Sequence, residues 1–137
     1  MAYAPRILVI EDEAPVGRLI ERILEDDGYF VTKVKTARHG LLKLRETSFD
    51  LAIVDMSLPD ADGPVLVRDI RAEFGCLRIL AVSGCMHGPM RGMAMAAGAD
   101  LTLEKPFTVS GLKDAVYRLL DPSCSWMGMG RLAQEVL

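Results

Sequence analysis

Acidic, hydroxyl and basic side chains come at the ends of four separate apolar runs, at residues 7–10, 51–54, 79–82 and 101–103. These side chains belong to Glu11, Asp12, Asp55, Ser83 and Lys105. If the runs are strands of one parallel sheet, their carboxyl ends lie along the same edge and bring these groups together. Carboxylates that are close to one another are unfavourable unless a cation or a reaction requires them. The pattern therefore indicates a divalent-metal site beside a carboxylate that can accept a phosphoryl group.

A sheet that could position these groups is indicated by strand-like and helix-like runs that alternate five times, as is typical of α/β proteins with a parallel sheet. Strands are predicted over residues 6–10, 30–34, 51–54, 78–82 and 101–103. Helices are predicted over about 15–28, 37–45, 63–73, 90–97 and 108–121, with Thr108 as an N-cap and Pro122 closing the last one. The helix at 90–97 is the weakest of these predictions, because glycine-rich sequence surrounds it and glycine costs a helix interior about 1 kcal/mol.

Composition sets limits on the kind of protein this is. The length of 137 residues suggests one domain, and a hydrophobic content of 50% is ample for a core. A net charge of −3 gives no electrostatic case for binding nucleic acid or anionic lipid. No apolar run is long enough to span a membrane, and the first residues do not resemble a signal peptide. Three widely spaced cysteines suit reduced cytosolic thiols.

The acidic residues fit a magnesium site, because Mg²⁺ takes oxygen ligands and usually keeps several waters. Asp12 and Asp55 are the expected direct ligands, with Glu11 acting through water. The turn formers Pro59 and Gly63 bound a loop after Asp55 that can present the backbone carbonyl of Ser57 to the metal.

Asp55 is also the expected nucleophile, because a carboxylate can form an aspartyl-phosphate. The transferred phosphoryl group carries charge on three oxygens, and this charge needs stabilisation. Mg²⁺ would contact one oxygen, the Lys105 ammonium a second, and the Ser83 hydroxyl with nearby backbone N–H groups the third.

Four motifs in order make the chain resemble a response-regulator receiver domain, the phosphate-accepting part of two-component signalling, in its single-domain, chemotaxis-regulator-like form. The resemblance covers residues 5–121 and leaves a tail of unknown role at 122–137. The matching motifs are the acidic pair in Ile7-Leu-Val-Ile-Glu-Asp-Glu13, Asp55 with Pro59 and Gly63, Ala81-Val-Ser-Gly84, and Lys105-Pro-Phe107. Each motif alone is weak, but chance does not readily place all four in order at such separations.

The resemblance implies a flavodoxin-like, doubly wound parallel sheet of order 2-1-3-4-5, with two helices on one face and three on the other. It also implies a cis Lys105–Pro106 peptide. In function, it implies a cytoplasmic bacterial signalling protein rather than an enzyme, one that assists its own Mg²⁺-dependent phosphorylation and dephosphorylation. A histidine kinase or phosphotransfer protein would donate the phosphoryl group. A protein effector would bind the face formed by the helix at 90–97, the strand at 101–103 and the last helix.

Departures from the family pattern bear on how such a switch would work. Glu11 stands where the family more often has Asp, and the extra length is compatible with a water-mediated metal contact. Thr102 replaces the usual Tyr or Phe, so the output would travel through the loop after Ser83 or the glycine-rich helix instead. Ser57 and Cys85 occupy positions that tune dephosphorylation, and neither suits orienting an attacking water. We therefore expect no unusually fast self-hydrolysis.

Alternative functions remain open from the sequence. Thr102 would suit a receiver-like module that signals without phosphorylation, and the chain could be a receiver fragment of a larger hybrid kinase or regulator. A flavodoxin would need a hydroxyl- and glycine-rich phosphate loop where Glu11-Asp12-Glu13 stands. An aspartate-based phosphatase would need a second acid at the position of Ser57.

Overall fold

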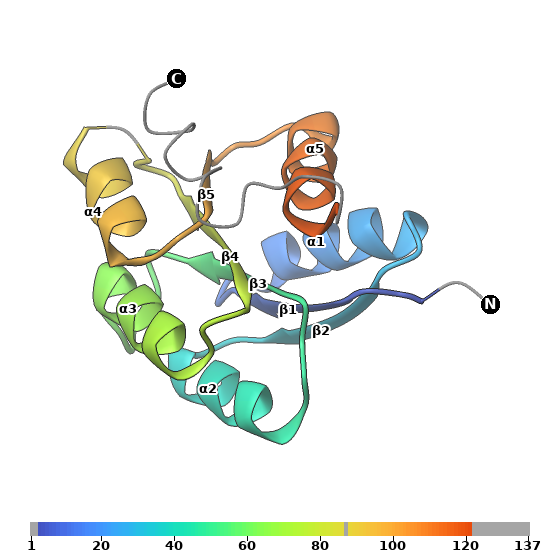
Figure 1. Ribbon diagram of the computed structural model, residues 1–137. Coiled ribbons are helices and arrows are strands. Elements are labelled where there is room, and N and C mark those ends of the chain that lie inside the picture. Colours follow the sequence, from blue (N-terminus) through green and yellow to red (C-terminus); the bar gives the residue numbers. More distant parts are fainter. Residues whose placement is uncertain (1–2, 87, 122–137) are drawn as a thin grey trace.

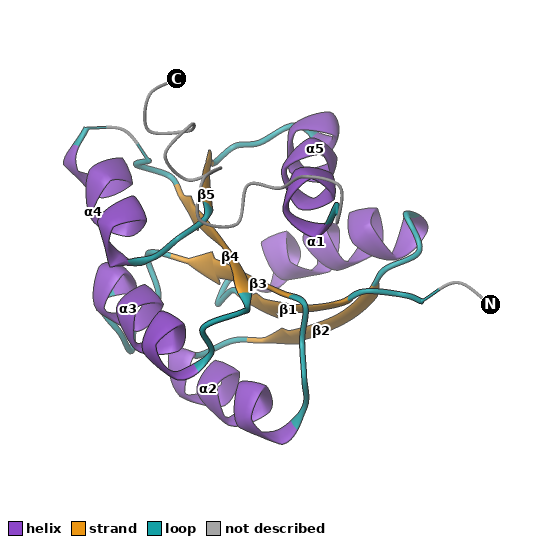
Figure 2. Ribbon diagram, viewed as in Figure 1, coloured by secondary structure: helices purple, strands orange, loops and turns teal. Residues whose placement is uncertain are grey.

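A computed structural model describes residues 3–86 and 88–121 of the chain. The tail at 122–137 and the role of Pro122 lie outside the described residues. Strands and helices alternate along the described part (Figure 2). They are β1 (Arg6–Ile10), α1 (Ala14–Asp26), β2 (Phe30–Val34), α2 (Ala37–Glu46), β3 (Leu51–Asp55), α3 (Gly63–Glu73), β4 (Arg78–Ser83), α4 (Pro89–Ala97), β5 (Leu101–Glu104) and α5 (Val109–Leu120).

The strands form one sheet of order β2-β1-β3-β4-β5 in which every neighbouring pair is parallel. Helices α1 and α5 cover one face, and α2, α3 and α4 cover the other (Figure 1). This confirms the predicted doubly wound, flavodoxin-like fold. Within the described segments, none of the helices is both long and apolar enough to span a membrane.

The core consists of two layers because successive side chains of a buried strand point to opposite faces of the sheet. In β1, Ile7 and Val9 pack toward α1 and α5, whereas Leu8 and Ile10 pack toward α2, α3 and α4. All four are fully buried. Burying a side chain of this size contributes about 1.5–3 kcal/mol, so β1 is held firmly between the two layers of helices.

The ends of the helices follow the local sequence. Thr108 is the N-cap of α5, as predicted, and its hydroxyl accepts a hydrogen bond from the Gly111 amide at 2.9 Å. Helix α4 forms despite its glycines and begins after Gly88, which has a positive φ of 59°. Pro89 stands in its first turn, where the missing proline N–H costs nothing.

Arg71 of α3 fastens the opposite end of α4. Its guanidinium donates to the Gly98 carbonyl at 2.9 and 3.1 Å and to the Asp100 carboxylate at 2.6 Å. Asp100 also accepts the Ile79 amide at 2.9 Å. Arg71 and Asp100 together thus join α3, the connection between α4 and β5, and the start of β4.

Candidate functional site

The predicted functional groups lie along the carboxyl edge of the sheet. Glu11 and Asp12 follow the last residue of β1, whereas Asp55 and Ser83 are themselves the last residues of β3 and β4. Asp55 is in register with Val82, so Ser83 lies one residue further along the neighbouring strand. Lys105 follows the last residue of β5, and its peptide bond to Pro106 is cis, as expected.

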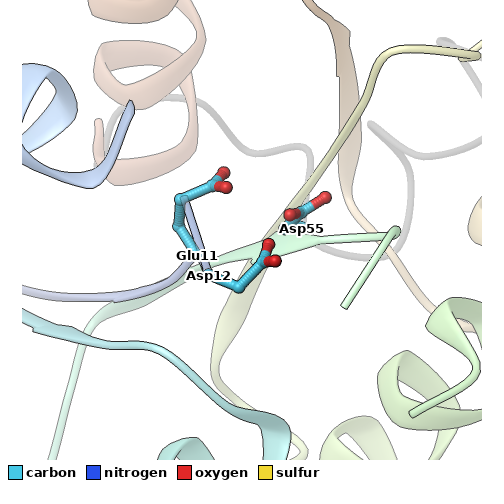
Figure 3. A group of neighbouring side chains, drawn as sticks. All are labelled: Glu11, Asp12 and Asp55. Atoms are coloured by element: carbon cyan, nitrogen blue, oxygen red, sulfur yellow. The ribbon is translucent and has the colours of Figure 1, made fainter. Parts of the chain in front are cut away.

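Three carboxylates converge at this edge. Glu11, Asp12 and Asp55 each offer an oxygen, and the three oxygens lie within 4.8 Å of one another. Figure 3 shows these side chains gathered together, with Glu11 and Asp12 at the end of β1 and Asp55 at the end of β3. Glu11 and Asp55 are only 4% and 3% exposed, so water screens their repulsion poorly. Such a cluster needs a positive charge.

Lys105 supplies positive charge to the cluster. Its ammonium lies 2.9 Å from Glu11 Oε1 and 3.7 Å from Asp55 Oδ2. It also lies 3.6 Å from Glu13 Oε1, which is far more exposed. Burial alone would lower the pKa of Lys105, but the hydrogen bond to Glu11 and the nearby carboxylates outweigh it and raise that pKa. The lysine therefore stays charged, with Glu11 as its nearest partner.

The Asp55 carboxyl is the most perturbed group at the site. Burial raises its pKa from 3.8 to about 6, and the negative charge of Glu11 acts in the same direction. The Ser57 amide, which donates to Asp55 Oδ1 at 2.9 Å, and the ammonium of Lys105 partly oppose this rise. Because these contacts do not offset the burial, a cation bound beside Asp55 would stabilise its charged form.

Backbone contacts hold the loops around Asp55 in place. The Met56 amide donates to the Val82 carbonyl at 2.8 Å, and the Lys105 amide donates to the Ser83 carbonyl at 2.8 Å. The Ser83 hydroxyl accepts the Cys85 amide at 3.1 Å. These bonds tie the start of each of the loops after β3, β4 and β5 to the end of β4.

The donor set fits magnesium. All three side chains offer hard carboxylate oxygens, which Mg²⁺ binds at about 2.1 Å, so any two ligands of one ion would lie no more than about 4.2 Å apart. Oxygens within 4.8 Å of one another can reach that geometry with small rotations, or with a water replacing one direct contact.

A comparison with protein families identifies this arrangement. The model of the response regulator receiver domain matches residues 7–117. The chain belongs to the response regulator receiver family. Receiver domains bind Mg²⁺ through acidic residues and act in two-component systems as phosphorylation switches, and the carboxylate cluster at the end of β1 and β3 agrees with this family role.

Individual regulatory proteins are similar to this chain in sequence. The KDP operon transcriptional regulatory protein KdpE of Escherichia coli is 35% identical over 107 residues, covering 78% of this chain and 47% of KdpE. The response regulator PhoP of Pseudomonas aeruginosa is 30% identical over 122 residues, covering 89% of this chain and 54% of PhoP. The chain thus spans about half the length of these relatives.

Solved receiver structures superpose closely on this fold. A CheY-like receiver domain from Methanospirillum hungatei has a TM-score of 0.83 and 29% identity, covering 87% of this chain and 95% of its own. The chemotaxis response regulator CheY4 of Vibrio cholerae has a TM-score of 0.81 and 25% identity, covering 86% of this chain and all of its own.

The structure brings together the groups that the sequence singled out. Glu11, Asp12, Asp55 and Lys105 share one cluster, Ser83 lies on the adjacent strand end, and the Ser57 amide contacts Asp55. Two contributors were not predicted: Glu13 as a third partner of Lys105, and Asp60 as a link from the Asp55 loop to α2. Glu13 adjoins the acidic pair, but an exposed acid there gives no sign of pairing with a lysine 92 positions away.

Proposed function

We propose that this chain is a phosphorylation-dependent signalling switch in which Asp55 accepts the phosphoryl group. A histidine kinase or a phosphotransfer protein donates it from a phosphohistidine in the bacterial cytoplasm. An Asp55 carboxylate oxygen forms the new bond to phosphorus as the bond from phosphorus to the imidazole nitrogen breaks. The observation that supports this role best is the position of Asp55, buried at a strand end with Lys105 Nζ 3.7 Å from its Oδ2.

The metal would be held by Asp12, Asp55 and the Ser57 carbonyl, with Glu11 acting through water. When bound, Mg²⁺ supplies positive charge beside the transferred group and neutralises its oxygens. Lys105 would move from Glu11 toward a phosphoryl oxygen, a short displacement, since its ammonium already lies between the two carboxylates. The Ser83 hydroxyl would donate to another phosphoryl oxygen. On this proposal the chain is not an enzyme acting on a separate substrate, but it assists its own phosphorylation and dephosphorylation.

Output would pass to a protein effector at the face formed by α4, β5 and α5, rather than to nucleic acid or a membrane. Exposed apolar side chains support this surface: Met93 of α4 is 50% exposed, and Val109 and Tyr117 of α5 are 51% and 62% exposed. Thr102 of β5 is partly buried in place of the family's aromatic residue. The signal would therefore reach this face through the loop after Ser83 or through α4.

Self-hydrolysis of the phosphoryl group that is not unusually fast is part of the proposal. Neither Ser57 nor the exposed Cys85 offers an acid or amide that could orient an attacking water. Self-hydrolysis should therefore be no faster than is ordinary for receivers, and a lifetime of seconds would contradict this expectation.

The test is intact mass after incubation with Mg²⁺ and acetyl phosphate, for wild type and Asp55→Asn. One phosphate adduct on the wild type alone is the expected result, and it should not form when EDTA is present from the start of the incubation. An adduct that persists in Asp55→Asn would place the acceptor elsewhere. If the wild type gains no adduct from acetyl phosphate, a repeat with a phosphorylated histidine kinase follows, and failure there would end the proposal.

The second candidate is a receiver-like module that signals without phosphorylation, and Thr102 is the observation that favours it. The two candidates differ in one cellular result. Asp55→Asn would leave the output of such a module intact, whereas it would abolish the output of a true switch.

A further inference from the structure

Asp60 connects the loop after Asp55 to a helix on a different part of the sheet. It lies five residues after Asp55 and one after Pro59. Its Oδ1 accepts the Ala37 amide at 3.0 Å, and its Oδ2 accepts the Arg38 amide at 3.2 Å. Both amides belong to the first turn of α2. A residue of the Asp55 loop therefore caps a helix that precedes it by more than 20 positions.

The cap on α2 comes from two sides. Thr36, the residue before the helix, accepts the His39 amide with its hydroxyl at 3.0 Å and the Gly40 amide with its carbonyl at 3.0 Å. The first four N–H groups of a helix have no partner within the helix. Here Asp60 satisfies those of Ala37 and Arg38 and the Thr36 hydroxyl satisfies that of His39, while the bond from the Gly40 amide to the Thr36 carbonyl is the first regular bond of the helix. Both amides stabilise the charged form of Asp60, the Ala37 amide more strongly, and hold the pKa of its carboxyl below the ordinary value.

The same loop is anchored at both of its ends. Near Asp55, the Ser57 amide donates to the Asp55 carboxylate at 2.9 Å. Near α3, Asp62 accepts the Val65 amide at 3.0 Å, and Gly63 is pressed against Met56 so closely that a Cβ would lie 2.7 Å from the Met56 oxygen. Asp60 adds an attachment between these ends. The path of the backbone through Ser57 therefore depends on where α2 begins.

We propose that Asp60 is a positioning residue, which sets the Ser57 carbonyl and the Asp55 carboxylate in the geometry that binds Mg²⁺ by fastening their loop to the N-terminus of α2. The inference rests on the proposed function, since it concerns the same site. Coupling between two sites is reciprocal, so metal binding at Asp55 must also tighten the Asp60 cap and steady the first turn of α2. Helix α2 thereby responds to the state of the site without touching it.

A control variant separates this role from ordinary helix capping. Thr36→Ala removes a cap from the same helix end but leaves the loop attached. Asp60→Ala removes the cap and detaches the loop. Capping residues contribute similarly to stability, so both variants should lower the urea midpoint by comparable amounts. Only Asp60→Ala should weaken Mg²⁺ binding, and Asp60→Asn, which keeps one acceptor oxygen, should fall between it and the wild type.

The experiment is calorimetric titration of the unphosphorylated full chain with Mg²⁺. The expected result is a three- to tenfold higher dissociation constant for Asp60→Ala, where tenfold corresponds to about 1.4 kcal/mol. Thr36→Ala should stay within about twofold of the wild type, or about 0.4 kcal/mol on the same scale. In the wild type, Mg²⁺ should also slow hydrogen exchange of the Ala37 and Arg38 amides severalfold, and Asp60→Ala should abolish this slowing.

Equal Mg²⁺ affinities for Asp60→Ala and Thr36→Ala would overturn the inference and leave the proposed function standing. Should Asp60→Ala fail to fold, the Mg²⁺ affinity of Asp60→Asn and the hydrogen exchange of the wild-type Ala37 and Arg38 amides decide the question. The coupling would be rejected if Asp60→Asn bound Mg²⁺ as tightly as the wild type and Mg²⁺ left the exchange of the two amides unchanged. A wild type that neither binds Mg²⁺ nor gains a phosphate adduct would overturn both proposals together.

Discussion

Replacing Asp55 by Asn should stabilise the protein at neutral pH in the absence of metal. The carboxylate is buried beside Glu11, and folding raises its pKa from 3.8 to about 6. One pKa unit corresponds to about 1.4 kcal/mol, so the shift of about two units costs the folded protein up to about 3 kcal/mol when Asp55 is ionised. An Asn side chain avoids this cost and can still accept the Ser57 amide. We expect a gain of about 1–3 kcal/mol at pH 7.

The gain should depend on pH in a defined direction. A carboxyl whose pKa is higher in the folded state binds its proton more tightly there, so its contribution to stability is full below pH 4 and is lost as pH rises through about 6. Asp55→Asn should therefore match the wild type near pH 4 and exceed it increasingly up to pH 7. The measurement is urea unfolding followed by circular dichroism between pH 4 and 7, with EDTA present.

Asp60→Asn is the matched control, because the same chemical change five residues further along the chain should act in the opposite direction. Hydrogen bonds from the Ala37 and Arg38 amides lower the pKa of Asp60, so its carboxylate stabilises the folded state at neutral pH. The Asn variant should lose stability at pH 7 and recover relative to the wild type as pH falls through the folded pKa of Asp60. An Asp55→Asn variant no more stable than the wild type at pH 7 would refute the assignment of burial as the dominant cause.

Two further substitutions test the framework around the site. Asp100→Ala should destabilise the protein by about 1–3 kcal/mol in urea unfolding, because it leaves the buried Ile79 amide without its acceptor and the partly buried guanidinium of Arg71 without its carboxylate. A loss below about 1 kcal/mol would mean that this pair contributes no more than an exposed one. Gly63→Ala should cost about 1–3 kcal/mol and slow phosphorylation by acetyl phosphate, because its Cβ would lie 2.7 Å from the Met56 oxygen and displace the residue next to Asp55. Gly75→Ala, where a Cβ meets nothing within 4 Å, should leave the phosphorylation rate unchanged.

The fold could be predicted because the three central strands, β1, β3 and β4, are short and continuous apolar runs. The strands ended slightly later than predicted: β3 includes Asp55 and β4 includes Ser83. An apolar run marks where a strand is buried, whereas the backbone pairing continues for as long as a neighbour is in register. Asp55 still pairs with Val82, and Ser83 with Glu104. The backbones of Asp55 and Ser83 are therefore held by the sheet itself, whereas Glu11, Asp12 and Lys105 lie just beyond the ends of their strands.

The pairing of Lys105 could not be predicted, because it depends on distances between three strand ends. Its type and place indicated a contact with the phosphoryl group on Asp55, but the ammonium lies closer to Glu11 than to Asp55, at 2.9 against 3.7 Å. Glu11 is one methylene longer than the more usual Asp, and this length lets its carboxylate reach the lysine. The departure from the family pattern therefore affects the lysine as well as the metal.

The two side chains that join helices across the fold could not have been found from the sequence either. Asp60 resembles an ordinary turn acid after a proline, and Arg71 resembles a solvated arginine near the end of a helix. Each acts on backbone groups 22 to 27 residues away that become neighbours only after the chain has folded. Hydrophobic periodicity reports which face of an element is buried, but not which polar atoms at its ends lack partners. Once the elements are placed, Asp60 meets the free amides at the start of α2, and Arg71 meets a carbonyl at the end of α4. The unpartnered ends of helices are thus where a fold acquires contacts that its sequence pattern does not indicate.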